Sequence, residues 1–383
     1  MAFSFGSLFK SVSSSLGQGE TSVLGIDIGA SSAKMVQLRA SRGVAVLETY
    51  GEISLGPYAG QPIGKTVKLN PEKSAEAIKD LMREANVTAR SGGLSIPFAS
   101  SLVIVLDLPE SDEDALKRIV PMEARKYIPI PVSEVSLDWF VIPKDDMQGS
   151  AFAEIGQQKQ QTKRPGQEVL LVAIHNNILQ QYQTLSGEAG VTINFYEIEI
   201  FSAIRSSLGH GIAPVMVVDL GASTTKIYIV ERGVVRMTHT ITTGGQQITE
   251  TLGRTMSWEF EKAERVKREH GLIDNTAFSV DENERIKTAI LSTLSRMFAE
   301  VNRVVLSYGQ RYNKNIAKIV LCGGGASLPG IQDVARTTLS SEVEIANPFG
   351  HTEAPAFLEG VLRQIGPGFA VSVGLALRKL KHD

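Results

Sequence analysis

A repeated hairpin motif constrains this chain more than any other feature of its sequence. The run VLGIDIGASSAKMVQL begins at Val23, and the run VMVVDLGASTTKIYIV begins at Val215. The same kinds of side chain recur at one constant offset: Asp27, Gly29, Ala30, Ser31, Ser32 and Lys34 in the first run, and Asp219, Gly221, Ala222, Ser223, Thr224 and Lys226 in the second. Recurrence at so many positions indicates two copies of one structural unit, and hence two lobes.

Each copy is predicted to be a β-hairpin that leads into further antiparallel strands. Apolar and β-branched residues precede the glycine, polar and apolar residues alternate after the lysine, and an Arg-Gly turn begins at Arg42 and again at Arg232. Helical patterns are predicted at 71–86, 111–127, 176–189, 200–208, 245–270 and 282–313. The chain is therefore predicted to be an α/β protein with duplicated mixed β-sheets.

The two halves differ by a segment at about 98–190, which has no counterpart in the second half and is predicted to be an inserted α+β subdomain. Within it, residues 144–168 are polar and Gln-rich, which is typical of a mobile surface loop. The predicted domains are a tail at 1–21, a first lobe at 22–212, a second lobe at 213–365, and a C-terminal helix at 366–383 that returns to the first lobe.

The chemistry of the repeated motif is that of a phosphate site. The glycine lets the backbone approach a phosphate, successive N–H groups form an anion-binding nest, and Ser31, Ser32, Ser223, Thr224 and Thr225 add hydroxyl donors. Lys34 and Lys226 add positive charge. Asp27 and Asp219 would repel phosphate, so we expect them to hold Mg²⁺ through its water shell. A single copy could be only a turn, but turn geometry does not require the lysine that both copies keep.

A third segment, KIVLCGGGASLPG from Lys318, is predicted to run from a buried strand through a glycine turn into a helix that opens near Pro329. We expect the backbone of Gly323, Gly324 and Gly325 to lie against a base or a ribose. A Rossmann dinucleotide site is the alternative, but the third glycine of its fingerprint is missing. Gly244 and Gly245 open another predicted helix, whose N-terminus can face an anion.

Composition excludes several other classes. The 39 basic residues against 41 acidic ones give a net charge of −2, so no overall field favours nucleic acid. One cysteine, Cys322, permits no internal disulfide, and there is no P-loop signature. No apolar run approaches the roughly 20 residues of a membrane span, and the N-terminus lacks a secretory pattern, so we expect a cytoplasmic protein. A short N-terminal helix is indicated by the spacing of Phe5, Leu8, Phe9 and Val12. This helix could pack on its own domain, form part of a loose tail, or contact a membrane or a partner.

These residues, in this order, resemble the actin-like ATPase superfamily, with its ribonuclease H-like two-lobed fold. The resemblance narrows to the PilM family of type IV pilus assembly. The matching motifs are ARKYIPIPVSEVSLDW, TTGGQQIT, the AERVK helix, VNRVVLSYGQRY, VLCGGGASLPG, the pair Asn347-Pro348, and FAVSVGLALRK. They extend from about residue 22 to 380, which is nearly the whole chain.

The resemblance implies ATP and Mg²⁺ in the cleft between the lobes. It places the glycines, hydroxyls and lysines of both hairpins at the phosphates, and Glu264, Lys267, Gly324, Gly325 and Ser327 at the nucleoside. It also implies that the N-terminal peptide of the inner-membrane protein PilN binds beside the inserted subdomain. The protein would then link this membrane complex to the pilus motor ATPases, and so be peripheral to the inner membrane through its partners.

Two points stay open at the level of sequence. Rapid hydrolysis needs a polar side chain that orients the attacking water. No motif marks such a residue in this sequence, although Glu199 is a candidate, so we expect slow or absent turnover. The alternatives to the pilus function are a cell-division filament protein of the FtsA type and a sugar-kinase-type phosphotransferase. The FtsA type ends in an amphipathic membrane helix, whereas this sequence stops at RKLKHD. Self-association is not determined by the sequence.

Overall fold

The computed structural model describes residues 22–143, 166–209 and 211–380, and the predicted N-terminal helix lies outside these residues. The described chain forms two compact units. One unit, which we call the insert, lies within residues 99–179, and the other, the main unit, contains the described residues on either side of it. The main unit contains both copies of the repeated hairpin.

The main unit holds two five-stranded sheets with the same strand order. The first runs β3-β2-β1-β4-β8 and the second β11-β10-β9-β12-β13. The strands of the first sheet are β1 (Ser22–Ile28), β2 (Ser32–Ser41), β3 (Val44–Ser54), β4 (Ser91–Ile96) and β8 (Thr192–Ile198). Those of the second are β9 (Val215–Leu220), β10 (Thr225–Glu231), β11 (Val234–Ile241), β12 (Lys318–Cys322) and β13 (Glu342–Ile345). The duplication therefore extends from the hairpin to whole sheets.

Both sheets are mixed, because the hairpin strands pair antiparallel and the later strands pair parallel to the first. The turn that follows each hairpin is also the same. Arg42 and Gly43 have φ values of 51° and 79°, and Arg232 and Gly233 have 53° and 77°. Positive φ at both central residues is the geometry of a two-residue hairpin turn that matches strand twist. The predicted Arg-Gly turns are confirmed.

Helices cover these sheets, and α1, α3, α4 and α7 below follow the predicted segments closely. In the main unit they are α1 (Pro71–Glu84), α3 (Asn176–Ala189), α4 (Glu199–Ser207), α5 (Gly245–Met256), α6 (Phe260–Glu269), α7 (Val280–Tyr312), α8 (Ile331–Thr338), α9 (Glu359–Ile365) and α10 (Ala370–Leu380), with α3 beginning in the insert. The capping chemistry explains where two of them begin. The Asn70 side chain accepts from the Lys73 amide before α1, and Ser279 and Glu282 form a capping box at α7.

Three corrections to the predicted elements have local causes. The helix predicted at 245–270 is interrupted, because Ser257 adopts a left-handed conformation (φ 55°) that ends α5. Pro329 does not lie in the first turn of α8, which begins at Ile331 after a left-handed Gly330. The predicted loop 144–168 lies mostly outside the described residues, but its last three residues already belong to a strand that begins at Gly166.

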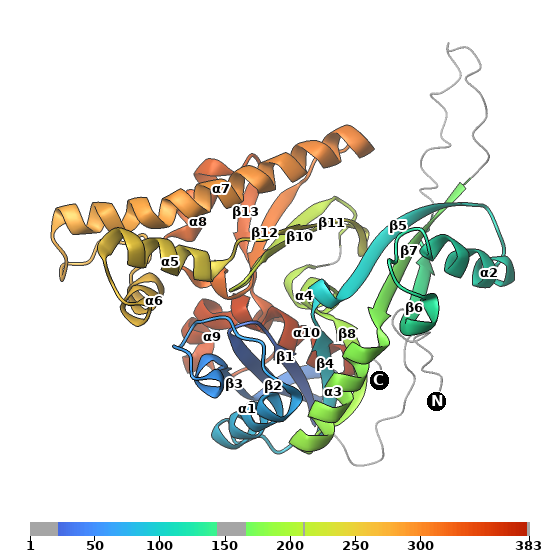
Figure 1. Cartoon of the computed structure of the whole chain (residues 1–383), viewed down its shortest axis with the longest axis horizontal. Helices are drawn as coiled ribbons and strands as arrows, with labels where there is room; N and C mark the ends of the chain where they lie inside the picture. Colours follow the sequence, from blue (N-terminus) through green and yellow to red (C-terminus); the bar gives the residue numbers. More distant parts are fainter. Residues whose placement is uncertain (1–21, 144–165, 210, 381–383) are drawn as a thin grey trace, which may run out of the picture. The chain divides into compact units, whose positions relative to one another are not determined.

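The insert is a three-stranded antiparallel sheet with one helix. Its strand order is β5-β7-β6, formed by β5 (Ser101–Pro109), β7 (Gly166–His175) and β6 (Val135–Val141), and α2 (Glu113–Ala124) packs beside it (Figure 1). A separate hydrophobic core, with Leu106, Leu116, Val120 and Leu171 among its buried members, joins the helix to the sheet. The insert therefore has a core of its own.

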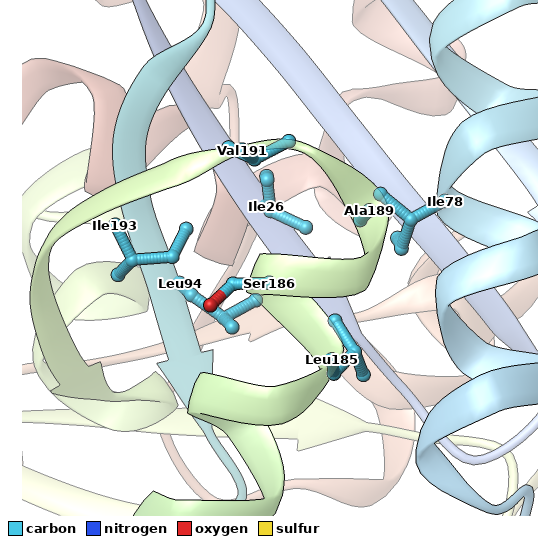
Figure 2. Close-up of a pocket in the computed structure, with 8 residues that line it drawn as sticks. All are labelled: Ile26, Ile78, Leu94, Leu185, Ser186, Ala189, Val191 and Ile193. Carbon is cyan, nitrogen blue, oxygen red and sulfur yellow. The ribbon is translucent and has the colours of Figure 1, made fainter.

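The first-lobe sheet packs against helices on both faces. One face packs against α1 and α3 in a core that includes Ile26, Ile78 and Leu185. Figure 2 shows a packing gap in this core, lined by Ile26, Ile78, Leu94, Leu185, Ser186, Ala189, Val191 and Ile193. The gap leaves no room for a water molecule and is lined almost entirely by apolar side chains. It is therefore a feature of the core and not a ligand site.

The opposite face of this sheet packs against α10. A Cβ atom added at Gly25 of β1 would lie 1.9 Å from the Ser372 carbonyl oxygen, and one at Gly374 of α10 would lie 1.9 Å from the Ser202 carbonyl oxygen. Backbone here lies directly against backbone, so neither position has space for a side chain. The C-terminal helix is held between β1 and α4 by this close approach.

We therefore expect Gly374→Ala to destabilise the protein by about 1–3 kcal/mol, since the added methyl group must push two backbones apart. Gly360→Ala in α9 is the matched control, because a Cβ at that position meets nothing within 4 Å. Urea unfolding followed by circular dichroism measures both variants. Equal stability of the two variants would show that α10 does not pack as described.

Among the described residues, one helical stretch, Ala356–Leu380, is long and apolar enough to cross a membrane. The sequence analysis predicted no segment of this kind, because Glu359 and Arg363 interrupt the apolar residues of this stretch. In the fold, 67% of its most apolar window is buried. The stretch contains α9, α10 and two 3-10 helices, η7 (Ala356–Leu358) and η8 (Gly366–Phe369), so it serves as part of the first-lobe core.

Candidate functional site

The two repeated hairpins have the same backbone geometry. Asp27 lies opposite Lys34 across β1 and β2, and Asp219 lies opposite Lys226 across β9 and β10. The Gly29 N–H donates to the Ser32 carbonyl over 3.0 Å, and the corresponding N–H in the second hairpin donates over 3.1 Å. The turn residues are accessible, because Gly29 and Ser223 are exposed and Ala30, Ser31, Gly221, Ala222 and Thr224 are half-buried. Both turns therefore leave backbone and hydroxyl groups available to a ligand.

A buried ion pair joins the two lobes beside these turns. Lys226 Nζ lies 2.8 Å from Glu199 Oε2 and 3.1 Å from Asp219 Oδ2. Glu199 is the first residue of α4 in the first lobe, and its Oε1 accepts from the Phe98 N–H over 2.6 Å. Glu199, predicted as the catalytic residue, therefore has both carboxylate oxygens engaged by protein groups.

Three carboxylates lie close enough in this region to influence one another. Burial raises the pKa of Asp27, and the charge of Asp219 raises it further, against the opposing effects of Lys34, Ser95 and Lys226. Burial likewise raises the pKa of Glu199, with Asp219 and Asp27 adding to the shift. The ends of β1 and β9 are thus electrostatic neighbours. Asp219 and Glu199 share the ammonium group of Lys226, whereas the charge of Lys34 acts most strongly on Asp27.

Lys226 balances much of this negative charge. Its burial favours loss of the proton, but the nearby Asp219 and Glu199 carboxylates outweigh that effect and raise the pKa of Lys226 above its usual value. Lys34 has a different environment, because its Nζ lies 2.8 Å from Ser32 Oγ and 3.1 Å from Glu52 Oε1. The two repeated lysines are therefore not equivalent: Lys226 connects the lobes, whereas Lys34 contacts partners in its own sheet.

Ser95 is a member of the site that the sequence did not identify. Its buried hydroxyl donates to Asp27 Oδ1 over 2.7 Å from β4, the strand that pairs parallel with β1. Cys322 lies opposite Asp219 in the second lobe, where β12 pairs in the same way with β9. The Cys322 thiol is buried at the end of β12, the strand that the sequence predicted to be buried. The register of the duplicated sheets is the signal that could have predicted a polar partner at Ser95.

The three glycines after β12 have distinct surroundings. A Cβ at Gly323, where φ is +80°, would lie 2.3 Å from Asp219 Oδ1, and one at Gly325 would lie 2.8 Å from Leu220 Cβ. Gly324 instead faces open space. A Cβ at Gly368, in η8, would lie 3.5 Å from Lys34 Cε and 3.6 Å from Gly324 Cα. The glycine turn is thus close to both the second hairpin and the first-lobe lysine.

Glu264 and Lys267 turn inward from α6, although a charged stripe on this helix would by default face solvent. Glu264 Oε2 accepts from Thr249 Oγ1 over 2.5 Å and from Lys267 Nζ over 2.6 Å, while Oε1 accepts from Arg268 Nε over 2.6 Å. Burial raises the pKa of Glu264, but these partners outweigh it and hold the pKa below its usual value. Burial also lowers the pKa of Lys267. Thr249 was not predicted, and it links α5 to this pair.

Several predicted donors are already engaged within the protein. The amides of Gly245 and Gln246 donate to the Gly221 and Ala222 carbonyls over 2.9 Å each, so the first turn of α5 supports the second hairpin. The Ser327 hydroxyl donates to the Gln364 carbonyl over 3.0 Å, and the Thr225 hydroxyl donates to the Thr243 carbonyl over 2.9 Å. Gly244 is tightly packed, since a Cβ there would lie 2.6 Å from two hairpin carbonyls. These residues therefore support the backbone of the site through contacts within the protein.

The described part of the chain contains no group of three His, Cys, Asp or Glu side chains arranged to hold a metal ion. Asp27 and Asp219 are consequently not part of a direct coordination cluster. Contact with a metal through its water shell, as predicted from the sequence, requires no such cluster.

Comparison with known families identifies the chain. A family model described as type IV pilus assembly protein PilM matches residues 25–380. The chain belongs to the PilM family. The resemblance predicted from the sequence motifs is confirmed, and so is the assignment to type IV pilus assembly.

Solved structures share the fold described above. A solved PilM–PilN type IV pilus biogenesis complex has a TM-score of 0.74 at 23% identity, with 94% of this chain and 98% of that chain covered. The ethanolamine utilization protein EutJ from Carboxydothermus hydrogenoformans has a TM-score of 0.53 at 16% identity, covering 94% and 90%. The predicted actin-like, two-lobed α/β fold is confirmed, and the Rossmann alternative is wrong.

Curated relatives of this PilM-family chain include cell-division proteins. FtsA of Bacillus subtilis is 21% identical over 372 residues, covering 88% of this chain and 81% of that protein. FtsA of Rhizobium meliloti is 30% identical over 178 residues, which span 42% of this chain and 39% of that protein. The matched region is thus less than half the length of the Rhizobium relative. These matches place PilM and FtsA in the same part of the actin-like superfamily.

Proposed function

We propose that this PilM-family protein binds ATP and Mg²⁺ between its two lobes and uses the bound state to organise the pilus assembly complex. The observation that supports this most strongly is the ion pair of Lys226 with Glu199 and Asp219. It joins α4 of the first lobe to the second hairpin, and the carboxylates of Asp27 and Asp219, one from each hairpin, are electrostatic neighbours there. Two phosphate-binding turns at one place can hold one chain of phosphates.

The accessible turn residues fit a triphosphate. In this proposal, the amides and hydroxyls of the two turns donate to phosphate oxygens, and Lys34 supplies the positive charge. Lys34 already lies near Gly324 through Gly368, so a phosphate held by the first hairpin would be close to the glycine turn. Gly324 is the natural place for a nucleoside, because a Cβ there meets open space. Glu264 and Lys267 would then contact the nucleoside from α6.

The electrostatics of the site fit a divalent cation. Buried carboxylates that repel one another hold their protons more tightly than usual, as the raised pKa values of Asp27 and Glu199 indicate. A cation held through water molecules by Asp27 and Asp219 would relieve this repulsion and neutralise phosphate charge. Mg²⁺ keeps several of its waters when it binds proteins, so such an arrangement suits it.

We propose that turnover is slow or absent in the isolated protein. Glu199 is engaged by Lys226 and Phe98, and Asp27 by Ser95, so neither carboxylate is poised to orient an attacking water. A phosphate-release assay on the purified protein should give a rate near background. A fast rate that is lost in Asp219→Ala would contradict this part of the proposal.

The partners follow from the family and are proposed here for this chain. The N-terminal peptide of PilN would bind beside the insert, and the pilus motor ATPases would contact the protein in the cytoplasm. The protein would thus be peripheral to the inner membrane through its partners. Its actin-like fold allows ATP at one site and a peptide at another, so nucleotide can change the affinity for the peptide.

Fluorescence anisotropy with a labelled PilN N-terminal peptide tests this proposal. We expect saturable binding, with an affinity that differs between the ATP-bound and nucleotide-free protein, and no binding of a scrambled peptide of the same composition. Absence of peptide binding in both states would contradict the pilus role, whereas equal binding in both states would contradict the coupling to nucleotide.

A further inference from the structure

A compact loop in the first lobe is anchored on the first phosphate hairpin. This segment, residues 55–67, leads from β3 towards α1 (Figure 1), and we call it the strap. The Leu55 N–H donates to the Ser31 carbonyl and the Val67 N–H donates to the Ala30 carbonyl, each over 2.9 Å. Both ends of the strap are therefore bonded to the turn of the first hairpin, as in a loop whose ends meet.

The strap reaches across to the second lobe. The Thr66 N–H and hydroxyl donate to Gln246 Oε1 over 2.8 Å and 2.7 Å. Lys65 Nζ lies 3.0 Å from Glu250 Oε1 and 4.8 Å from the centre of the Phe260 ring. These contacts are made by α5, which begins at the predicted anion-facing residue Gly245, and by α6, which carries the predicted nucleoside-binding residues Glu264 and Lys267.

Gln246 continues this contact to the second phosphate hairpin. Its backbone N–H donates to the Ala222 carbonyl over 2.9 Å, while its side chain accepts from Thr66. A short path of hydrogen bonds therefore runs from Ala30 in one turn, through Val67, Thr66 and Gln246, to Ala222 in the other. Any movement of one hairpin away from the other must break this path or stretch it.

Gly64 places the strap directly on Glu264. It is buried, its φ is +87°, and a Cβ added to it would lie 2.6 Å from Glu264 Cδ. The main chain of the strap thus covers the carboxylate that we propose for the nucleoside. Gly60, in the same strap, also has positive φ, at +65°, but a Cβ there meets nothing within 4 Å.

From this geometry we infer that the strap is a latch that couples the two phosphate hairpins and limits how fast nucleotide leaves the site. The inference rests on the proposed function. The latch is held by a few partly exposed hydrogen bonds and one ion pair, which are individually weak, so it can open and close without unfolding of either lobe. Opening would separate Thr66 from Gln246 and lift Gly64 from Glu264, which uncovers the nucleoside end of the site.

Gly64→Ala and Gly60→Ala form a matched pair that tests the latch. Both substitutions put a methyl group at a positive φ in the same loop, but only the first pushes against Glu264. In stopped-flow displacement of a fluorescent ATP analogue by excess ATP, we expect release from Gly64→Ala to be roughly tenfold faster than from wild type, equivalent to about 1.4 kcal/mol. Release from Gly60→Ala should stay close to the wild-type rate.

Hydrogen exchange in the absence of nucleotide gives an independent readout. Gln246→Leu removes the acceptor of the Thr66 amide, so we expect that amide to exchange faster than in wild type, whereas the neighbouring Gln247→Leu should leave it unchanged. Failure of wild type to bind ATP would overturn the proposed function and the latch together. ATP binding with wild-type release rates in Gly64→Ala and Gln246→Leu would overturn the latch alone.

Discussion

Replacing Lys226 by methionine is expected to lower the free energy of unfolding by about 3–5 kcal/mol at neutral pH, because it leaves buried carboxylates without their shared ammonium group. Asp219 and Glu199 have side chains that are only 9% and 12% exposed, so water cannot replace that partner. Urea unfolding measures the loss. Lys73→Met is the control, since Lys73 pairs with Glu76 on the surface and both side chains are 51% exposed.

The penalty should depend on pH in a defined direction. The pKa values of Asp27 and Glu199 are already raised in the folded protein. These groups therefore favour folding most below their unfolded pKa values of about 4. That contribution is lost as the pH rises through their pKa values in the folded protein. Loss of Lys226 raises both folded pKa values further. The variant should therefore approach wild-type stability in acid, below the folded pKa values that these two groups have in wild type. A Lys226→Met protein as stable as Lys73→Met at pH 7 would contradict the described ion pair.

Glu197→Gln is expected to destabilise the protein by a similar amount, about 3–5 kcal/mol, because Glu197 is the counter-charge for two arginines in a buried position. Arg205 donates to both of its oxygens over 2.7 Å and 2.8 Å, and Arg378 donates to Oε1 over 2.9 Å. Ser202 donates to the other oxygen. Since Arg378 lies in α10, this cluster fastens the C-terminal helix to β8 and α4.

This second penalty should have a different pH window. Burial raises the pKa of Glu197, but the two arginines and Ser202 outweigh it and lower the pKa below its usual value. The contribution is therefore present above an unfolded pKa of about 4 and is lost only as pH falls through the lower folded value. Glu359→Gln, which breaks a surface pair with Arg363, is the control and should have little effect. Unchanged hydrogen exchange of the α10 amides in Glu197→Gln would contradict the role of this charged cluster in holding α10.

Local sequence predicted the hairpins and helices well, because local chemistry sets them. The alternation around Asp27 and Asp219 and the Arg-Gly turns specify the hairpins without help from the rest of the chain. Asn70 with Pro71, and Ser279 with Glu282, mark where α1 and α7 begin by capping. The break at Ser257 in the predicted helix at 245–270 was not foreseen, because a left-handed residue is rarely recognisable from sequence unless it is Gly or Asn.

The site depends on contacts between distant segments, which local patterns do not contain. Ser95 and Asp27 are far apart in sequence and meet because β4 pairs with β1. Gly64 meets Glu264 only when the lobes are assembled. Glu199 was predicted as a residue that orients water, yet the fold uses its two oxygens to bind Lys226 and Phe98. The residue types indicated which side chains belong to the site, but the contacts between them could be identified only from the three-dimensional structure.

The central claim, that both hairpins hold the phosphates of one nucleotide, is tested most directly by titrating ATP and AMP into wild type, Lys34→Ala and Thr224→Val. Loss of a charge-assisted contact costs about 1.5–3 kcal/mol, so ATP should bind Lys34→Ala on the order of 10- to 100-fold more weakly, and Thr224→Val several-fold more weakly. AMP, which lacks the outer phosphates, should bind all three proteins alike. If ATP affinity is unchanged in either variant, or AMP is weakened as much as ATP, the two hairpins do not share one chain of phosphates.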